Sequence, residues 1–295
     1  MSVPHVSVIV TCYNYANYLE GCLASILNQT YRDFELVIVN DGSTDNTDEV
    51  ISRFLANDKV RYINQKNTGQ AIATNNGIAA AAGELIAFLD ADDLWEPTKL
   101  EKQVRLFNRD SIGVVYSRIR FMDAEGRPLD MQLEGKYYTP RSGRVTDALL
   151  FENFIPYSST LVRKECFDKF GMFNPEYKNG LDWDLWLRIS REYEFDFVDE
   201  YLLIYRIGHP GQLTSNVERS VRCADLIFDR FLEENPGIVP DSVVRKAMAY
   251  SYCRRGNQFR KIDRKRSNGF FLSALAKNPA EIGAYVGLVK NFLNM

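Results

Sequence analysis

The chain has 295 residues, of which 45% are hydrophobic and 25% are charged, and its formal net charge is -3. This composition is typical of a soluble globular protein with a sizeable core, and the length allows one large domain or two. The near-neutral balance excludes neither an acidic nor a basic partner.

The cysteines and the apolar runs indicate the compartment. Five cysteines are scattered without a Cys-x-x-Cys pair, which indicates reduced thiols and argues against a zinc cage. The N-terminus lacks a basic segment followed by an apolar core, and no run of about 18 apolar residues occurs. We therefore expect a cytoplasmic protein without a signal peptide or a membrane span.

The first 110 residues alternate between strand and helix patterns. Strands are predicted at 6–10, 34–39, 60–63 and 85–89, and helices at 18–27, 45–55, 68–82 and 97–107. Strands that alternate with helices at this spacing indicate βαβ units. We predict an α/β fold with a Rossmann-like, mainly parallel sheet flanked by helices.

The remaining chain divides into two regions. Residues 110–205 are less regular, with strands predicted at 113–121 and 159–162, a turn at 126–128 and a helix at 180–193. After about 211 the pattern is helical, and 247–257 with 268–276 resemble a helical hairpin. Residues 212–295 carry 14 Lys and Arg against 8 acids, whereas 1–211 carry 22 against 31. We therefore predict two parts, 1–211 and a small, basic, helical region at 212–295.

Polar residues follow three of the predicted strands. Thr11, Asp41 and Asp90 each come at the carboxyl end of an apolar run. Ligands of open parallel sheets bind outside the carboxyl ends of the strands. The three residues are therefore predicted to converge on one binding site.

The fourth of these strands runs into three acids, Asp90, Asp92 and Asp93. Clustered carboxylates repel one another, and a hard cation such as Mg²⁺ or Mn²⁺ relieves that repulsion through oxygen ligands. Because Mg²⁺ sites often use one or two carboxylates plus substrate phosphates, a phosphorylated ligand is expected beside the metal. The alternative is a polar turn in which Asp92 or Asp93 caps the helix at 97–107.

Several spaced segments resemble family 2 glycosyltransferases. They are Val6–Asn14, Ser25–Thr30, Phe34–Asp45, Asn67–Gly69 with Asn75–Ile78, Phe88–Asp93 and Leu181–Arg188. The resemblance covers about residues 4–210 in the family's order. It implies a GT-A fold, a nucleotide-binding half at about 1–110 and an acceptor half at about 111–211. It also implies a nucleotide-diphosphate sugar donor, a Mn²⁺ or Mg²⁺ ion and inversion at the anomeric carbon.

The resemblance assigns roles around the nucleotide. Asp41 would read the base, which in similar enzymes is uracil, and Asp90 would contact the ribose or the metal-bound water. Asp92 would bind the metal. The remaining nucleotide-binding candidates are Thr11, Tyr13, Asn14 and Lys66. Alternatively, Tyr13 is a packing aromatic and Asp41 a turn-forming residue.

Asp182 is the candidate general base that takes the proton of the acceptor hydroxyl. Apolar neighbours such as Trp183 raise the pKa of such a carboxyl group if the site is desolvated. Asp182 could instead only cap the helix at 180–193, and Asp184 is the competing acid, although it can pair with Arg188. Related enzymes often carry Glu-Asp where this chain has Leu181-Asp182, which puts the acceptor-binding role of that Glu in doubt.

The segment 205–209 resembles the Tyr-Arg-x-His segment of the family, with one extra residue before the histidine. His209 is a candidate for contact with the diphosphate or the metal, and a surface loop histidine is the alternative. Lys66 and Arg206 are weaker phosphate candidates, since most exposed basic residues are simply solvated. The processive motif Gln-x-x-Arg-Trp and membrane-spanning helices are absent, so we predict transfer of one sugar per encounter.

Seven basic residues cluster between Arg254 and Arg266, opposed only by Asp263. Such a cluster favours contact with an anionic membrane on the inner face of the plasma membrane, where a lipid-linked acceptor would sit. The alternative is a solvated helical face. Nucleic-acid binding is not expected, because no recognised motif occurs and the remainder of the chain is acidic.

The leading interpretation is an inverting, metal-dependent glycosyltransferase of surface polysaccharide or glycolipid assembly, with a UDP-sugar as the expected donor. A sugar nucleotidyltransferase is an alternative. Such an enzyme is expected to have a glycine-rich phosphate-binding loop near the first strand, and residues 11–17 contain no glycine. A third interpretation is an inactive transferase domain that serves as an interaction module. The presence of Asp41, Asp90, Asp92 and Asp182 argues against it.

Overall fold

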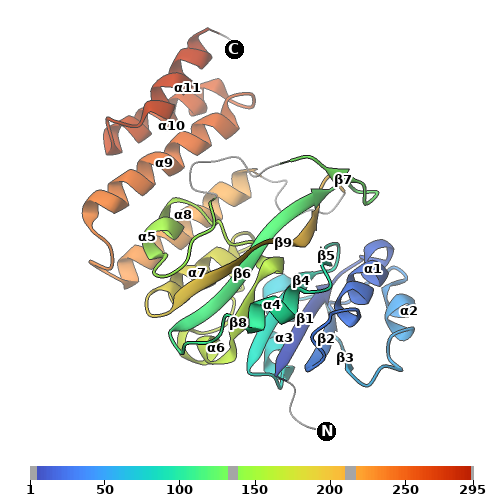
Figure 1. The fold of residues 1–295 in the computed structure, drawn as a ribbon. Coiled ribbons are helices and arrows are strands. Elements are labelled where there is room, and N and C mark those ends of the chain that lie inside the picture. The colour runs from blue at the N-terminus through green and yellow to red at the C-terminus, as the bar shows by residue number, and fades with distance from the viewer. Residues whose placement is uncertain (1–4, 132–138, 210–216, 294–295) are drawn as a thin grey trace.

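The computed structural model describes residues 5–131, 139–209 and 217–293. In this part of the chain the strands form one nine-stranded sheet with the order β3-β2-β1-β4-β8-β6-β9-β5, and β7 pairs with β6 (Figure 1). The strands are β1 (Val6–Cys12), β2 (Phe34–Asn40), β3 (Val60–Asn64), β4 (Leu85–Asp90), β5 (Leu94–Trp95), β6 (Ile112–Met122), β7 (Pro128–Leu129), β8 (Leu161–Arg163) and β9 (Glu194–Arg206).

The nucleotide-binding half predicted from the sequence is a parallel sheet. Strands β3, β2, β1 and β4 pair in parallel, as do β6 and β9, whereas β8 is antiparallel to both β4 and β6. The helices are α1 (Ala16–Leu27), α2 (Thr47–Ser52), α3 (Gln70–Ala80), α4 (Lys99–Val104), α5 (Thr146–Phe151), α6 (Lys164–Phe170), α7 (Leu181–Ser190), α8 (Val217–Glu234), α9 (Asp241–Phe259), α10 (Arg264–Lys277) and α11 (Ile282–Phe292). The predicted mixed α/β fold with a mainly parallel sheet is confirmed.

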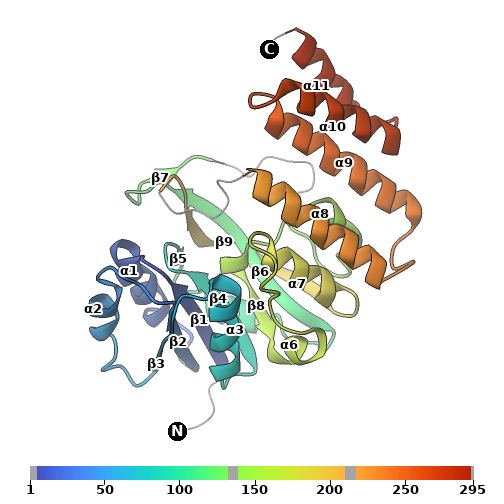
Figure 2. The ribbon, with the colours of Figure 1, turned by 180° about the vertical axis from the view of Figure 1, so that it is seen from behind.

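Successive side chains of a strand point to opposite faces of the sheet. Because both sets contain buried apolar residues in β1, helices cover both faces. Val8 and Val10 of β1 pack in one apolar cluster with α1 and α2, whereas Ile9 faces the opposite cluster with α3, α6 and α7. Figure 2 shows α3, α6, α7 and α8 along one face of the sheet. Burial on both faces favours the continuous apolar runs from which these strands were predicted.

The helical region begins as part of the main body and ends as a separate arm. Ile227 and Phe231 of α8 and Ala247 of α9 are buried in the same core as α7. Further along, Cys253, Phe271, Ala274 and Ala284 form their own cluster between α9, α10 and α11. The predicted boundary at 211 lies outside the described residues, and the hydrophobic core continues across it.

Strand β9 was not predicted. Apolar and polar residues do not alternate regularly along its thirteen positions, because much of the strand is partly exposed and its register against β6 shifts three times. The strand predicted at 159–162 is a short 3-10 turn at Tyr157–Ser159 followed by β8. In the described residues no helix combines the length and the apolar character that crossing a bilayer requires.

Candidate active site

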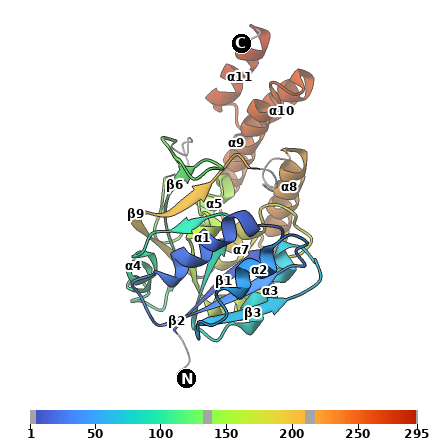
Figure 3. The same cartoon turned by 90° about the vertical axis from the view of Figure 1, so that its right-hand side faces the viewer.

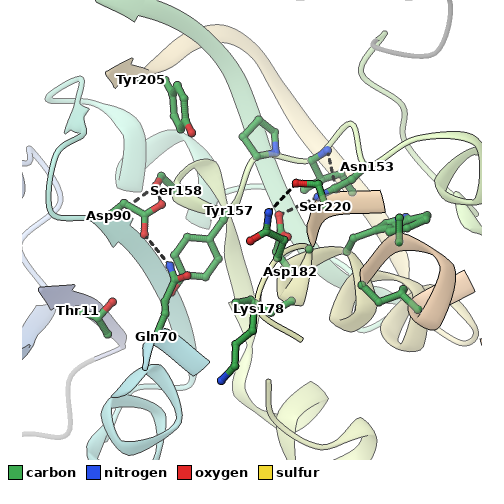
Figure 4. A pocket seen from close by; sticks show the side chains of 18 of the residues that line it. Thr11, Gln70, Asp90, Asn153, Tyr157, Ser158, Lys178, Asp182, Tyr205 and Ser220 are labelled. Carbon is green, nitrogen blue, oxygen red and sulfur yellow. Dashed lines mark hydrogen bonds between the residues drawn. The ribbon is translucent and has the colours of Figure 1, made fainter. Parts of the chain in front are cut away.

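One cavity of about 1250 Å³ opens at the carboxyl edge of the parallel strands. Seven predicted site residues line it, namely Thr11, Tyr13, Asn14, Asp41, Asp90, Asp92 and Asp182. Five others are not among its lining residues, namely Lys66, Asp93, Asp184, Arg206 and His209. Figure 4 shows Asp90 on one side of this cavity, Asp182 on the other and Tyr157 between them.

Strand register brings the first group together. Thr11 of β1 lies opposite Asp90 of β4, and the next residue of β1 lies opposite Asn40 of β2. Asp41 follows directly, and its backbone N–H bonds the carbonyl of Cys12. Three strand ends at the same level form one edge, which is the crevice where open α/β sheets bind ligands.

Asp41 is buried and its carboxylate holds the loop that leads into α3. Oδ1 accepts hydrogen bonds from Gln65 Nε2 at 2.7 Å and from the backbone N–H of Thr68 at 2.9 Å, and Oδ2 accepts from the N–H of Gly69 at 2.8 Å. This loop is a second wall of the cavity. Asp41 therefore both lines the cavity and shapes it.

Tyr13 and Asn14 form the outer rim. The ring of Tyr13 is 44% exposed, so the predicted alternative of a packing aromatic is wrong. Asn14 has a φ of 59°, a region that asparagine tolerates better than most residues, and its Oδ1 accepts from the N–H of Thr44 at 2.7 Å. Lys66 is exposed and lies outside the cavity lining.

Asp90 is held by two residues that the sequence did not single out. Gln70 Nε2 donates to Oδ1 at 3.1 Å, and the Ser158 hydroxyl donates to Oδ2 at 3.2 Å (Figure 4). Burial, together with the nearby charge of Asp92, raises the pKa of Asp90 to about 7. A carboxylate whose pKa is raised in this way is stabilised by a proton or by a nearby cation.

Asp92 is in direct contact with His209. The distance from His209 Nε2 to Asp92 Oδ2 is 2.7 Å, and the His209 side chain is 1% exposed. The rings of Tyr15 and Tyr18 flank the imidazole, with centroids 5.8 and 5.1 Å away. His209 is therefore not the surface loop histidine of the alternative interpretation.

Asp93 does not cap the helix that follows, and the alternative capping roles of Asp92 and Asp93 are wrong. Helix α4 starts after Thr98, and Asp93 Oδ1 instead accepts from the backbone N–H of Arg206 at 2.9 Å. The Arg206 guanidinium donates to the carbonyls of Asp92, Asp123 and Ala124. Arg206 thus fastens the turn that carries Asp92, and its buried guanidinium serves backbone carbonyls rather than the cavity.

Asp182 lies in the first turn of α7 but is not its N-cap, because that position is Gly180 with a φ of 73°. Asn153 Nδ2 donates to Asp182 Oδ2 at 2.8 Å. Burial raises the pKa of Asp182, and the bond from Asn153 opposes that rise. The neighbouring Trp183 lines the cavity with its Nε1 bonded to the Leu149 carbonyl at 2.7 Å, which fixes the ring beside the carboxylate.

Asp184 points elsewhere, and its predicted pairing with Arg188 is confirmed. Its Oδ2 accepts from Arg188 Nη2 at 2.7 Å. Arg188 also donates to the carbonyls at 170, 171 and 172, so the pair ties α7 to the loop after α6. Among the two acids of this helix, only Asp182 faces the cavity.

The cavity continues beyond Asp182 into a part that the sequence did not reveal. Helices α8 and α9 line this far part with Val221, Ala224, Ser251, Arg254, Arg255 and Gln258, among others. Arg254 pairs with the buried Glu152, which also accepts from the Tyr250 hydroxyl at 2.9 Å. Arg255 pairs with Asp225 at 2.6 Å. The basic cluster from Arg254 onwards therefore starts inside the cavity rather than on an outer face.

The residues present fit a divalent cation only with help from a ligand. Among the described residues no group of three or more His, Cys, Asp and Glu is placed to hold a metal. Asp92 and His209 meet as a carboxylate and an imidazole, both of which Mn²⁺ accepts, beside the crowded carboxylate of Asp90. Such a donor set suits an ion whose remaining ligands are phosphates and water.

The sequence matches a known family. The profile described as Glycosyl transferase family 2 matches residues 7–171. An uncharacterized glycosyltransferase of Nostoc is 36% identical over 61% of this chain, and one of Rickettsia felis is 32% identical over 78%. The chain spans 56% and 38% of these two relatives. The chondroitin synthase of Escherichia coli is 32% identical over 72% of this chain, which covers 30% of that protein.

Solved structures share the fold. Staphylococcus aureus TarS 1-349, in complex with UDP-GlcNAc, superposes over 98% of this chain and 88% of its own with a TM-score of 0.72 and 16% identity. The mannosyltransferase PcManGT of Pyrobaculum calidifontis, in complex with GDP-Man and Mn²⁺, does so over 99% and 81% with a TM-score of 0.68 and 18% identity. With the profile matching more than half of the chain, the protein belongs to glycosyl transferase family 2 and has the GT-A fold.

Proposed function

We propose that this glycosyltransferase moves one sugar from a nucleotide-diphosphate sugar to a hydroxyl of a saccharide or lipid-linked acceptor, with inversion and with a divalent cation. One observation carries the proposal: a single cavity joins Asp90 and Asp92 at the strand ends to Asp182 on α7. Acids for the nucleotide and metal and a separate carboxylate for proton removal are what an inverting transfer requires.

The nucleotide would lie across the ends of β1 and β2. Tyr13 offers an exposed ring for stacking, Thr11 a hydroxyl, and Asp41 an acceptor for a base N–H. The neighbours in fold bind UDP-GlcNAc in one case and GDP-Man in the other, so fold alone does not choose the base. A carboxylate can accept from the N–H of uracil, and we propose a UDP-sugar on that ground.

Asp92 and His209 would hold Mn²⁺ or Mg²⁺ together with the diphosphate. The crowding of Asp90 and Asp92 supports this assignment, because a cation between carboxylates and phosphates relieves the repulsion that raises the pKa of Asp90. When bound, the ion supplies Lewis-acid stabilisation of the leaving diphosphate. The hydrogen bonds that Arg206 donates to Asp93 and to the carbonyl of Asp92 hold the turn that carries Asp92.

Asp182 would remove the proton of the acceptor hydroxyl as that oxygen attacks the anomeric carbon. Its raised pKa supports the role, because a base is most effective when its pKa lies near the working pH. Asn153 orients the carboxylate through Oδ2. Attack from the side of Asp182, opposite the leaving diphosphate, inverts the anomeric configuration.

The acceptor would enter the far part of the cavity, between α5, α8 and α9. Arg254, Gln258 and Ser251 offer donors there for sugar hydroxyls or for an anionic group of the acceptor. The chondroitin synthase among the relatives supports a polysaccharide or glycolipid pathway. The family match favours this function over a sugar nucleotidyltransferase and over an inactive interaction module.

Donor hydrolysis and donor binding test the proposal together. Thermal shifts and hydrolysis are measured with UDP-, GDP- and dTDP-sugars, with and without Mn²⁺. Asp182→Asn is expected to keep the donor-induced shift and to lose turnover, whereas Asp92→Ala is expected to lose the Mn²⁺-dependent shift. Asp58→Asn, an exposed acid outside the cavity lining, is the control. Full turnover in both site variants would show that the assignment is wrong.

A further inference from the structure

Helix α11 turns most of its large apolar side chains outwards, whereas Leu288 packs against the cluster between α9, α10 and α11. Small or polar residues face the rest of the arm: Ala284, Gly287 and Asn291 are buried against α9 and α10, and a Cβ at Gly287 would lie 2.1 Å from the Phe271 ring. The large exposed residues are Ile282, Tyr285, Val286, Val289, Phe292 and Leu293. Their spacing is that of one helical face, so α11 is amphipathic with its apolar stripe on the outside.

This exposure is large. Phe292 is 87% and Ile282 is 74% exposed, and the stripe runs the whole length of the helix. In Figures 1 and 3, α11 lies at the outer side of an arm that projects away from the sheet. A contiguous apolar patch of this kind marks an interaction surface rather than scattered surface residues.

A basic turn lies at one end of the stripe. The turn between α9 and α10 carries Arg260 and Lys261 beside Ile262, which is 65% exposed, and Lys265 follows in the first turn of α10. Asn291 near the end of α11 donates to Ser267 Oγ at 2.9 Å in the first turns of α10. The end of the apolar stripe and the basic turn therefore lie at the same end of the arm.

The arm as a whole is cationic. From Asp241 to Met295 the chain carries eleven Lys and Arg against three acids. Three of these cations pair with acids outside the arm: Arg254 with Glu152, Arg255 with Asp225, and Arg266 with Glu218. Arg260, Lys261 and Lys265 lie near Arg266 in the chain and form no ion pair within the described residues.

We propose that the outer face of this arm docks on a membrane surface that contains anionic phospholipid. The apolar stripe of α11 would lie in the interface between head groups, and the cations of the α9–α10 turn would lie near lipid phosphates. A second copy of the chain is the competing occupant. A symmetric dimer through this face would bring two cationic arms together, and that repulsion favours the anionic surface instead.

Vesicle co-sedimentation of the full chain tests the proposal. Vesicles of phosphatidylcholine alone are compared with vesicles that also contain phosphatidylglycerol, at low and high salt. Binding is expected only with the anionic lipid and is expected to weaken with salt. Val289→Glu with Phe292→Glu, and separately Lys261→Glu with Lys265→Glu, are each expected to reduce the partition coefficient at least about tenfold.

The control is Leu55→Glu, which changes an exposed apolar residue on the body of the protein in the same way. Its binding is expected to match that of the unchanged chain, and circular dichroism melts verify that each variant folds. Absence of binding to anionic vesicles at low salt would overturn the proposal. So would a dimer in sedimentation equilibrium that Val289→Glu dissociates, since the stripe would then bind a second copy. Donor hydrolysis is expected to be the same in all these variants, which separates this test from the proposed function.

Discussion

Asn153→Ala is expected to move the acid limb of the pH–activity profile. Asn153 Nδ2 donates to Asp182 Oδ2 at 2.8 Å and stabilises the charged form of that carboxylate against the burial that raises its pKa. Without the amide, the pKa of Asp182 rises further. A general base must be deprotonated, so activity increases with pH through this pKa, and the limb is expected to move to higher pH.

The size of the movement follows from the bond that is lost. A hydrogen bond to a charged group contributes about 1.5 to 3 kcal/mol, and one pKa unit corresponds to about 1.4 kcal/mol. We therefore expect the acid limb to move up by about 1 to 2 pH units. Well above the new pKa the variant is expected to keep most of its activity, because the carboxylate is then charged in both proteins.

The assay is kcat/KM for transfer or donor hydrolysis across the pH range, which reports the free enzyme. Gln70→Ala is the matched control, because it removes the corresponding amide from Asp90 on the other side of the cavity. If the limb moves with Gln70→Ala and not with Asn153→Ala, Asp90 controls the profile and the assignment of Asp182 is refuted. A uniform loss of activity at every pH in Asn153→Ala would also refute it.

Three further predictions concern stability. Burial raises the pKa of Asp182, so the contribution of this carboxyl group to stability is greatest at low pH and is lost as pH rises through the folded pKa. The melting temperature of Asp182→Asn is therefore expected to be higher than that of the unchanged chain at neutral pH. The difference in melting temperature is expected to vanish in acid. Arg188→Ala leaves the buried carboxylate four residues before it unpaired and is expected to lower the free energy of unfolding by about 3 to 5 kcal/mol in urea titrations. A Cβ at Gly256 would lie 2.4 Å from the Phe271 ring, so Gly256→Ala is expected to destabilise the chain by about 1 to 3 kcal/mol in the same titrations, whereas Gly269→Ala, with open space around it, is not.

The local sequence pattern was sufficient to predict those site residues that lie at the ends of strands. The apolar run 85–89 ends at Asp90 because a strand buried on both faces must be apolar until its end reaches the crevice. The same reasoning placed Thr11 and Asp41 at neighbouring strand ends, and register puts all three at one edge. The fold class, the family and the parallel half of the sheet were therefore readable from the sequence.

Tertiary packing decided which residues contact the acids of the site. His209 meets Asp92 across 117 positions, Gln70 meets Asp90 across 20, and Asn153 meets Asp182 across 29. Their positions depend on how loops and helices pack on the sheet, and this information is not carried by local periodicity.

The C-terminal helices illustrate the difference most clearly. In the sequence, the cluster from Arg254 to Arg266 reads as one basic stretch. In the structure, Arg254 and Arg255 line the cavity and pair with Glu152 and Asp225, whereas the residues of the α9–α10 turn are not among the lining residues. The sequence by itself determined the strands, the acids at their ends and the helical character of this region. Which of these cations serve the cavity was decided by the packing of α8 and α9 against the body, because that packing selects which side of each helix meets the site.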